Sequence, residues 1–154
     1  MIQRIQSVYL FLISLFSFLS LTGNLFSFTN DSGRLFISLF PLNTELPVPG
    51  SFFPVLLKVT FILLILIALI ALTTLFLFRY RKIQLKLSLL LIILSAILIL
   101  VMISFMYLFS TAGNASVSPC ISYLFPLLMF IFSILAYRGV RKDELLVRSY
   151  ERLR

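Results

Sequence analysis

The sequence predicts an all-α integral membrane protein: a four-transmembrane-helix bundle with both termini in the cytoplasm, ending in a short amphipathic C-terminal helix. Two observations predict this fold. Residues 87–137 contain no charged side chain, and shorter charge-free runs cover residues 5–30 and 59–78. Hydrophobic residues make up 61% of the chain, whereas soluble domains average about 45 to 50% on a comparable count. An unpaired backbone amide in a bilayer costs several kcal/mol, so such runs form helices that satisfy their own main chain.

The Lys and Arg residues are segregated along the chain. Only Arg34 and Lys58 lie between the first two charge-free runs. The other eleven precede the first run, separate the second from the third, or follow the last: Arg4, Arg79, Arg81, Lys82, Lys86, Arg138, Arg141, Lys142, Arg148, Arg152 and Arg154. Because Lys and Arg concentrate in cytoplasmic loops, this asymmetry predicts an even number of spans and cytoplasmic termini. The formal charge of +8 thus indicates orientation in a membrane and not binding to nucleic acid.

Four spans follow from the apolar runs and the turns between them. We expect helices over residues 5–28, 53–78, 87–110 and 119–137, which with an extracytoplasmic loop at 29–52 form one transmembrane domain, residues 1–137. At about 1.5 Å per residue these helices reach about 28 to 39 Å, enough for a hydrocarbon core of about 30 Å. A cleaved secretory signal is the alternative for the first span, but its apolar run is too long and residues 21–24 offer no small-residue cleavage site.

Small and weakly polar residues recur within the spans. Leu gains nothing by leaving lipid for another Leu, so helices approach each other where the side chains are small. We therefore expect packing seams at these positions. The second interpretation is a solute pathway lined by Ser14, Ser17, Asn24, Ser95 and Ser133. Pro126 is expected to bend the fourth helix, since its ring removes a backbone hydrogen bond.

The outer side of the predicted bundle carries one apolar run in its loop, residues 35–40. Six residues are too few to cross a membrane. We expect this run at the membrane surface or over the mouth of the bundle, for instance as a short strand; a ligand-binding role is the second interpretation. Lys58 lies about one turn inside the second span, where its aliphatic stem reaches the headgroups. Binding of an anionic ligand is the second interpretation for Lys58.

The sequence lacks the residues that most catalytic and metal sites use. It contains no His, which removes the usual general base near neutral pH and a common ligand for transition metals. None of the five Asp and Glu residues lies within a predicted span, so no carboxylate is placed to carry protons across a membrane. The five glycines are scattered and form no phosphate-binding loop. We expect no enzyme activity, no cofactor and no metal.

The cytoplasmic tail, residues 138–154, is basic and amphipathic. Leu146, Tyr150 and Leu153 recur at i, i+4 and i+7, which is the spacing of one helical face. Glu144 precedes Arg148 by four residues, so the two side chains can pair on a helix. The tail can rest its apolar side on lipid, dock onto the start of the first helix, or bind a partner protein. Anionic headgroups attract each nearby Lys or Arg by about 1 kcal/mol.

Both ends of the chain resemble a known family. Residues 1–10 (MIQRIQSVYL), 135–149 (LAYRGVRKDELLVRS) and 152–154 (RLR) are similar to the four-span "domain of unknown function 4293" family of Bacteroidota inner-membrane proteins. At positions 150 and 151 this chain has Tyr and Glu, where many relatives have a small residue and Asp. The resemblance implies a bacterial inner (cytoplasmic) membrane and assigns no activity.

We therefore expect a noncatalytic accessory or scaffold component of a bacterial inner membrane. Its basic cytoplasmic ends would contact a partner protein or anionic lipid headgroups. The alternative hypothesis is a small oligomeric carrier or channel for an uncharged or lipidic solute. The candidate contact residues come from both ends of the chain: Gln3, Arg4, Gln6, Arg138, Arg141, Lys142, Asp143, Glu144, Arg148 and Arg152.

Overall fold

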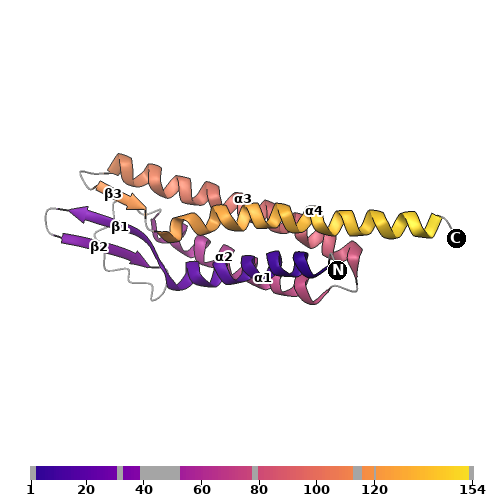
Figure 1. Ribbon diagram of the computed structural model, residues 1–154. Coiled ribbons are helices and arrows are strands. Elements are labelled where there is room, and N and C mark those ends of the chain that lie inside the picture. Colours follow the sequence, from indigo (N-terminus) through magenta and orange to yellow (C-terminus); the bar gives the residue numbers. More distant parts are fainter. Residues whose placement is uncertain are drawn as a thin grey trace.

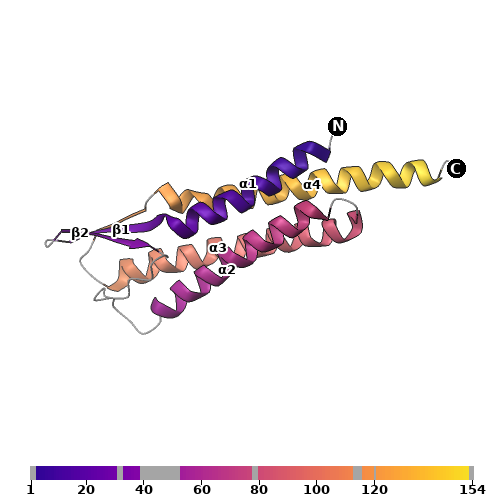
Figure 2. The same cartoon turned by 90° about the horizontal axis from the view of Figure 1, so that it is seen from below.

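The computed structural model is an elongated helical bundle with a small sheet at one end (Figure 1). It describes residues 3–30, 33–38, 53–77, 80–112, 116–119 and 121–152, with side chains over 5–23, 54–77, 80–108 and 123–146. Its four α-helices are α1 (Gln3–Thr22), α2 (Phe53–Phe76), α3 (Arg81–Ala112) and α4 (Phe125–Arg152). Figures 1 and 2 place both termini at the end of the bundle opposite the sheet.

Three helices are long and apolar enough to cross a membrane, over Ile5–Thr22, Pro54–Phe76 and Arg81–Leu108. Their outer surfaces are apolar: Val8, Ile62 and Ile103 are each more than half exposed. Exposed aliphatic side chains in such numbers are typical of a surface that faces lipid. In α4, by contrast, the charge-free part covers only residues 125–137. The four helices confirm the helical prediction, and three of them have the composition of membrane spans.

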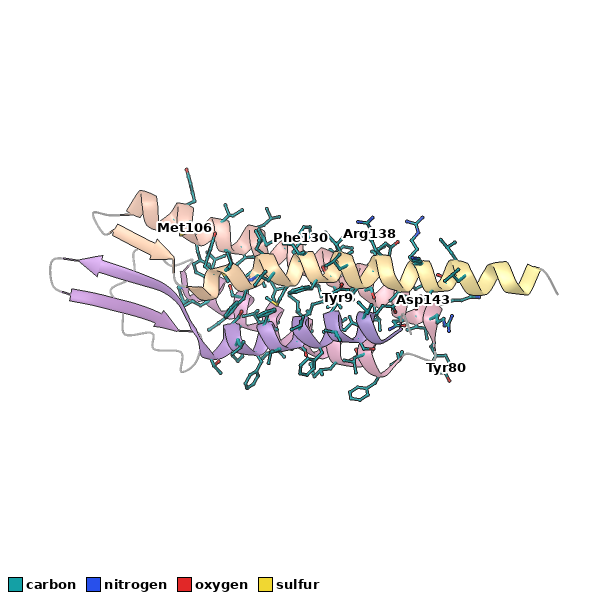
Figure 3. All side chains as sticks on the ribbon, viewed as in Figure 1. Tyr9, Tyr80, Met106, Phe130, Arg138 and Asp143 are labelled. Carbon is teal, nitrogen blue, oxygen red and sulfur yellow. The ribbon has the colours of Figure 1, made fainter. Side chains whose placement is uncertain are left out.

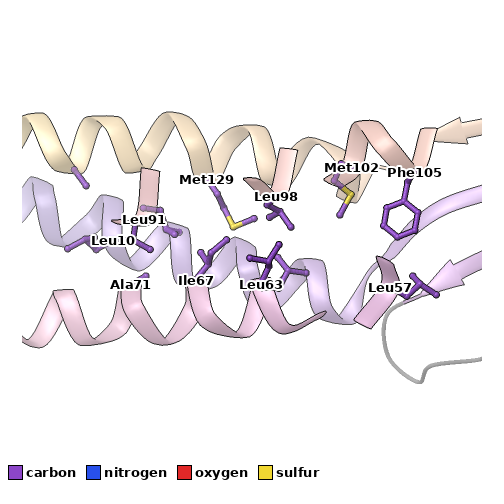
Figure 4. Packing of buried hydrophobic residues seen from close by; sticks show 13 residues of the cluster. Leu10, Leu57, Leu63, Ile67, Ala71, Leu91, Leu98, Met102, Phe105 and Met129 are labelled. Carbon is purple, nitrogen blue, oxygen red and sulfur yellow. The ribbon is translucent and has the colours of Figure 1, made fainter. Parts of the chain in front are cut away.

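The core lies on the bundle axis and receives side chains from all four helices. Figure 4 shows its members in layers, with Leu10, Leu91 and Ala71 nearer the termini, Ile67 and Met129 near the middle and Phe105 nearer the sheet. The cluster comprises Leu10, Ile13, Leu57, Leu63, Leu64, Ile67, Ala71, Leu91, Leu98, Met102, Phe105, Met129 and Ala136. The bundle therefore has one continuous apolar interior.

The first helix is shorter than predicted. We expected it to run to residue 28, but α1 ends at Thr22, where the Gly23 amide donates to the Leu19 carbonyl at 2.9 Å. Gly is the usual residue just past the end of a helix. Strand β1 (Asn24–Asn30) follows directly; there Phe26 and Phe28 alternate with Ser and Thr, the two-residue period that favours a strand.

The sheet joins the connection between α1 and α2 to the connection between α3 and α4. Strand β1 is central and pairs antiparallel with β2 (Gly33–Ser38) and β3 (Ser116–Pro119), giving the order β2-β1-β3. Phe28 faces Leu35 on one side and Val117 on the other. Part of the apolar run at residues 35–40 thus forms a strand, and its last two residues lie outside the described chain. The sheet is an addition to the predicted all-α fold.

The turn between α2 and α3 is tighter than predicted. We expected the third helix to begin at residue 87, yet α3 begins at Arg81 and includes Lys82 and Lys86. The Tyr80 carbonyl accepts from the amides of Ile83 and Gln84 at 3.1 and 3.0 Å, which closes the first turn. Charged residues are compatible with this first turn because Lys and Arg are good helix formers.

The last helix begins later and ends later than predicted. A 3-10 helix, η1 (Ile121–Leu124), precedes α4, so the expected span over 119–137 starts with β3 and η1. Pro126 does not bend α4; it stands in the first turn, where a missing amide hydrogen is tolerated. The tail does not form a separate short helix, because α4 crosses residue 137 without a break and continues to Arg152.

Candidate functional site

Helices α1 and α4 meet along an antiparallel seam lined by aromatic rings. Near the sheet, the ring of Phe16 stacks on Phe125 and Phe132, with centroids 5.4 and 5.9 Å apart. About two turns of α1 closer to the termini, the rings of Tyr9 and Phe132 lie 6.0 Å apart. Offset stacking at such distances is favourable beyond the area that it buries. These rings fix the register of α1 against α4.

At the end that holds both termini, the same seam becomes polar. The Gln6 side chain is 5% exposed, and its Nε2 donates to Oδ2 of Asp143 at 2.6 Å. The hydrogen bond joins α1 to α4 through two residues that are 137 positions apart in sequence. Figure 3 shows Asp143 on the side of α4 that faces α1. A short bond to a charged acceptor is among the stronger hydrogen bonds of proteins.

Gly139, one turn before Asp143, allows the Gln6 side chain to reach that carboxylate. A Cβ atom at position 139 would lie 2.7 Å from Gln6 Cγ and 3.3 Å from Cδ and Nε2. The 2.7 Å distance is too short for a real Cβ contact, so any other residue would displace Gln6. Gly inside a helix costs about 1 kcal/mol relative to Ala. Here the close contact with Gln6 explains why Gly occupies this position. We call Gln6, Gly139 and Asp143 the terminal clasp.

The three clasp residues extend the buried stripe of each helix. On α4, Ala136 and Val140 are fully buried, and Gly139 and Asp143 continue at three- and four-residue spacing. On α1, Gln6 is four residues before Leu10 and seven before Ile13, which are both buried. Residues at this spacing share one face of a helix. Among the described side chains, the clasp is therefore the last layer of the α1–α4 interface toward the termini.

The exposed side of α4 at this level is basic. Arg138, Arg141 and Lys142 are exposed, and Figure 3 shows Arg138 on the side of α4 away from α1. Lys82 and Lys86 of α3 are also exposed, and α3 begins at this end of the bundle (Figure 1). Lys58, which the charge pattern assigned to the other side, is exposed on α2 near the sheet end.

The predicted contact residues thus fall into two groups. Gln6 and Asp143 bind each other, so the beginning of the tail contacts the first helix. Arg138, Arg141 and Lys142 remain exposed, and Glu144 is half-buried. Outside the described side chains lie those of Gln3, Arg4, Arg148 and Arg152. The predicted pair of Glu144 with Arg148 therefore lies outside them too.

The seam residues in the middle of the bundle are closely packed. Ser17 is fully buried and its Oγ donates to the Leu64 carbonyl of α2 at 2.6 Å. Ser95 and Ser133 are buried, and their hydroxyl oxygens lie 3.4 Å apart between α3 and α4. Ser14 donates to the Phe11 carbonyl of its own helix at 2.8 Å. The hydroxyls proposed to line a solute pathway are used for helix packing, and Asn24 is described only as part of β1.

The described side chains leave no buried polar atom without a hydrogen-bond partner. Within the same residues, no group of three or more His, Cys, Asp or Glu side chains is placed to hold a metal ion. The Asp143 carboxylate makes a part-buried contact with Gln6. This end of the bundle therefore combines a helix, α4, that is held at Asp143 with an exposed basic surface.

Sequence reasoning missed some of these contacts. The predictions from the sequence do not include the stacking of Phe16 with Phe125 and Phe132, although aromatic residues seven apart on each helix were its signal. Gly139 was placed among scattered glycines, although a Gly between strong helix formers indicates a close approach. Gln84 donates from Nε2 to the Thr74 carbonyl at 3.4 Å across the α2–α3 turn, and a lone Gln beside basic residues gave no distinct signal.

Comparison with known families matches nearly the whole chain. A family model described as "Domain of unknown function (DUF4293)" matches residues 2–153. The chain belongs to this family. The DUF4293 match includes both ends of the sequence, and with them all three residues of the terminal clasp. No curated protein and no solved structure matches the chain.

Proposed function

We propose that this DUF4293 protein is a noncatalytic membrane component that acts as an accessory or scaffold subunit. Its basic terminal end contacts a partner protein or anionic lipid. The observation that carries the proposal is the terminal clasp together with the unbroken α4. Gln6 and Asp143 hold α4 against the bundle, while the helix continues to Arg152 and projects past the other helices (Figures 1 and 2).

In this proposal all four helices cross a bacterial inner membrane. Three have the length and composition of spans. For the fourth crossing, η1 and the charge-free part of α4, residues 121–137, together reach about 28 Å, at about 2.0 Å per residue of 3-10 helix and 1.5 Å per residue of α-helix. That length is close to a hydrocarbon core of about 30 Å. The position of α4 within the bundle, packed on α1 and α3, supports the fourth crossing.

The proposed orientation places both termini and the α2–α3 turn in the cytoplasm. The exposed cations Lys82, Lys86, Arg138, Arg141 and Lys142 all lie at the end with the termini. Lys and Arg accumulate on the cytoplasmic side of membrane proteins. The sheet would then lie on the outer side, where it joins the two outer connections of the bundle.

The noncatalytic part of the proposal rests on the side chains available. The chain has no His, and the Asp143 carboxylate already accepts a hydrogen bond from Gln6. In the middle of the bundle the hydroxyls donate to backbone carbonyls, as the Ser17 hydroxyl does to the Leu64 carbonyl. These features favour a packed, structural membrane domain over a site that turns over a substrate.

Three variant chains test the proposal. One ends at Glu144, which keeps the clasp and removes the projecting end of α4; one carries R138Q, R141Q and K142Q; one carries K58Q as the control at the opposite end. Each is purified in mild detergent, and bound anionic phospholipid and stoichiometric protein partners are measured. We expect the first two to lose partner or lipid and K58Q to keep both. Unchanged lipid and protein in all three would contradict the proposed function.

A cysteine-labelling experiment tests the orientation. In a Cys120→Ser background, Tyr80→Cys at the α2–α3 turn and Asn43→Cys in the outer loop are labelled in intact cells with a membrane-impermeant maleimide. We expect labelling at position 43 without lysis and at position 80 only after lysis. Labelling of both positions in intact cells would contradict cytoplasmic termini.

A further inference from the structure

The projecting end of α4 has a fixed direction, because the helix is held against α1 as far as Asp143. Val140 is 1% exposed and Asp143 accepts from Gln6. Beyond Asp143 the helix continues to Arg152 with no break, which adds about 13 Å of helix at about 1.5 Å per residue. Figures 1 and 2 both show this end continuing along the axis of α4. A helix held in this way stands away from the bundle and does not fold back along it.

The height of this end above a membrane follows from the sequence. Arg138 is the first charged residue after the apolar part of α4, so it marks the boundary of the hydrocarbon. Leu145 and Leu146 lie about 10 and 12 Å further along the helix. The two headgroup layers raise the thickness of the bilayer from about 30 Å to about 40–45 Å, so each layer is only about 5 to 7 Å deep. The two leucines are therefore beyond the headgroups, in water.

The surface at that height combines apolar and basic side chains. Leu145 is 59% exposed and Leu146 is 44% exposed. Arg141 and Lys142, one turn earlier, are exposed beside them. Two adjacent exposed leucines on a fixed helix, bordered by cations, form the kind of surface that a groove on another protein covers.

The charge of this end decides which occupant fits. Residues 138–154 contain six Lys or Arg and three Asp or Glu, so the same end of a second copy would repel it. Lipid fits Arg138 and Arg141 near the headgroups, but it does not reach Leu145 and Leu146 on a helix held upright. An apolar groove bordered by carboxylates on a protein satisfies both the leucines and the cations.

We propose that the end of α4 beyond Asp143, with Leu145, Leu146, Arg141 and Lys142, docks into an acidic, apolar groove of a cytoplasmic protein. This inference rests on the proposed function and names the partner class: a soluble protein that binds a helix through leucine contacts and carboxylates. The terminal clasp holds the helix in place before the partner binds, and this lowers the entropy lost on binding.

A designed peptide tests the chemistry of the site. The full-length protein is placed in nanodiscs of phosphatidylcholine, and fluorescence anisotropy measures binding of an amphipathic helical peptide with leucines on one face and flanking glutamates. The control peptide has lysines in place of the glutamates. We expect the acidic peptide to bind at least about tenfold more tightly, and L145S/L146S or R141Q/K142Q to weaken it about tenfold. The matched control K82Q/I83S, which changes an exposed cation and an exposed apolar residue on α3, should bind like the parent.

A depth measurement separates this inference from lipid binding. A fluorophore at Leu146→Cys in the Cys120→Ser background is exposed to quenchers attached to lipid chains, with and without about one third anionic lipid. We expect no quenching in either membrane, whereas the same label at the exposed, apolar position Val8→Cys should be quenched. Quenching at 146, or equal binding of the acidic and basic peptides, would overturn the inference. Loss of anionic lipid in R138Q/R141Q/K142Q would then leave the broader proposed function standing.

Discussion

The α1–α4 seam differs between its middle and its terminal end. In the middle, the ring of Phe16 on α1 stacks on Phe125 and Phe132 of α4, with centroids 5.4 and 5.9 Å apart. At the terminal end, Gln6 and Asp143 bind side chain to side chain at 2.6 Å above Gly139. The middle holds by close packing of small and aromatic residues. The terminal end holds by one specific set of three residues.

This difference separates two roles of the seam. Packing in the middle tolerates substitutions that keep the side-chain volume, because it depends on shape and buried area and not on one specific pair of polar groups. The clasp accepts few, because each of its members depends on the other two. Substitutions at the clasp should therefore change the position of the projecting helix, whereas substitutions in the middle should change stability only slightly.

The largest expected effect is that of Gly139→Leu. The new side chain would occupy the space of Gln6, and overpacking of this kind costs about 1 to 3 kcal/mol, partly offset by the better helix propensity of Leu. We expect the free energy of unfolding in mixed micelles to fall by about 2 kcal/mol. Arg138→Leu, the exposed neighbour, is the control and should change it little. Equal effects at 138 and 139 would show that Gln6 does not restrict position 139.

Asp143→Ala should have the next largest effect. It removes the acceptor of the half-buried hydrogen bond and leaves the Gln6 amide without its partner, which costs about 1 to 3 kcal/mol. Lys142→Ala, on the exposed side of the same turn, should cost less than about 0.5 kcal/mol. Unfolding titrations of the two variants give the comparison. A loss at Lys142 as large as that at Asp143 would contradict the contact between Asp143 and Gln6.

A double substitution sharpens the role of Gly139. In the Gln6→Ala background the space above position 139 is open, so Gly139→Ala should stabilise the helix by about 1 kcal/mol, the ordinary gain of Ala over Gly. In the parent chain the same change should give no gain, since the Cβ would lie 2.7 Å from Gln6 Cγ. The double-mutant cycle measures the difference as a coupling energy. A coupling energy of zero would contradict the close approach.

The smallest expected effect is that of Ser17→Ala in the middle of the bundle. The Ser17 hydroxyl bonds the Leu64 carbonyl between helices, and such bonds within membranes contribute about 0.6 kcal/mol on average. Thr73→Ala, an exposed hydroxyl that bonds its own helix, is the matched control and should be neutral. If Ser17→Ala lowers the free energy of unfolding by more than about 2 kcal/mol, the specific contacts that hold the helices together lie in the middle of the bundle and not at the clasp.

The sequence predicted the helices well because their signal is strong. Charge-free runs mark α2 and most of α3, and the distribution of Lys and Arg separates one end of the bundle from the other, as the termini and the sheet do in Figure 1. Helix ends were predicted less well. The Phe26 and Phe28 alternation lay inside an apolar run, where a strand and a helix have the same composition and only pairing with β2 and β3 distinguishes them.

The candidate site was predicted by residue but not by arrangement. Gln6 and Asp143 were chosen because they belong to the ends that resemble the family, and docking of the tail was one of three interpretations. Nothing in the sequence says that Gln6 donates to Asp143, since the two are 137 residues apart. The charge boundary at Arg138 predicts the end of a helix, whereas α4 continues through it to Arg152. A change of charge alters the solvent that a helix faces and does not end the helix.

Disulfide cross-linking of Gln6→Cys with Gly139→Cys tests the central claim, that α4 is held against α1 at the terminal end. The Cβ position at 139 lies 2.7 Å from Gln6 Cγ, so the two Cβ atoms are at most about 4.2 Å apart, within the range of about 3.5 to 4.5 Å that a disulfide needs. In membranes of the Cys120→Ser chain, we predict nearly complete cross-linking under mild oxidation, and none for the control Val8→Cys with Gly139→Cys. No cross-link at positions 6 and 139, or an equal yield in the control, would contradict the account.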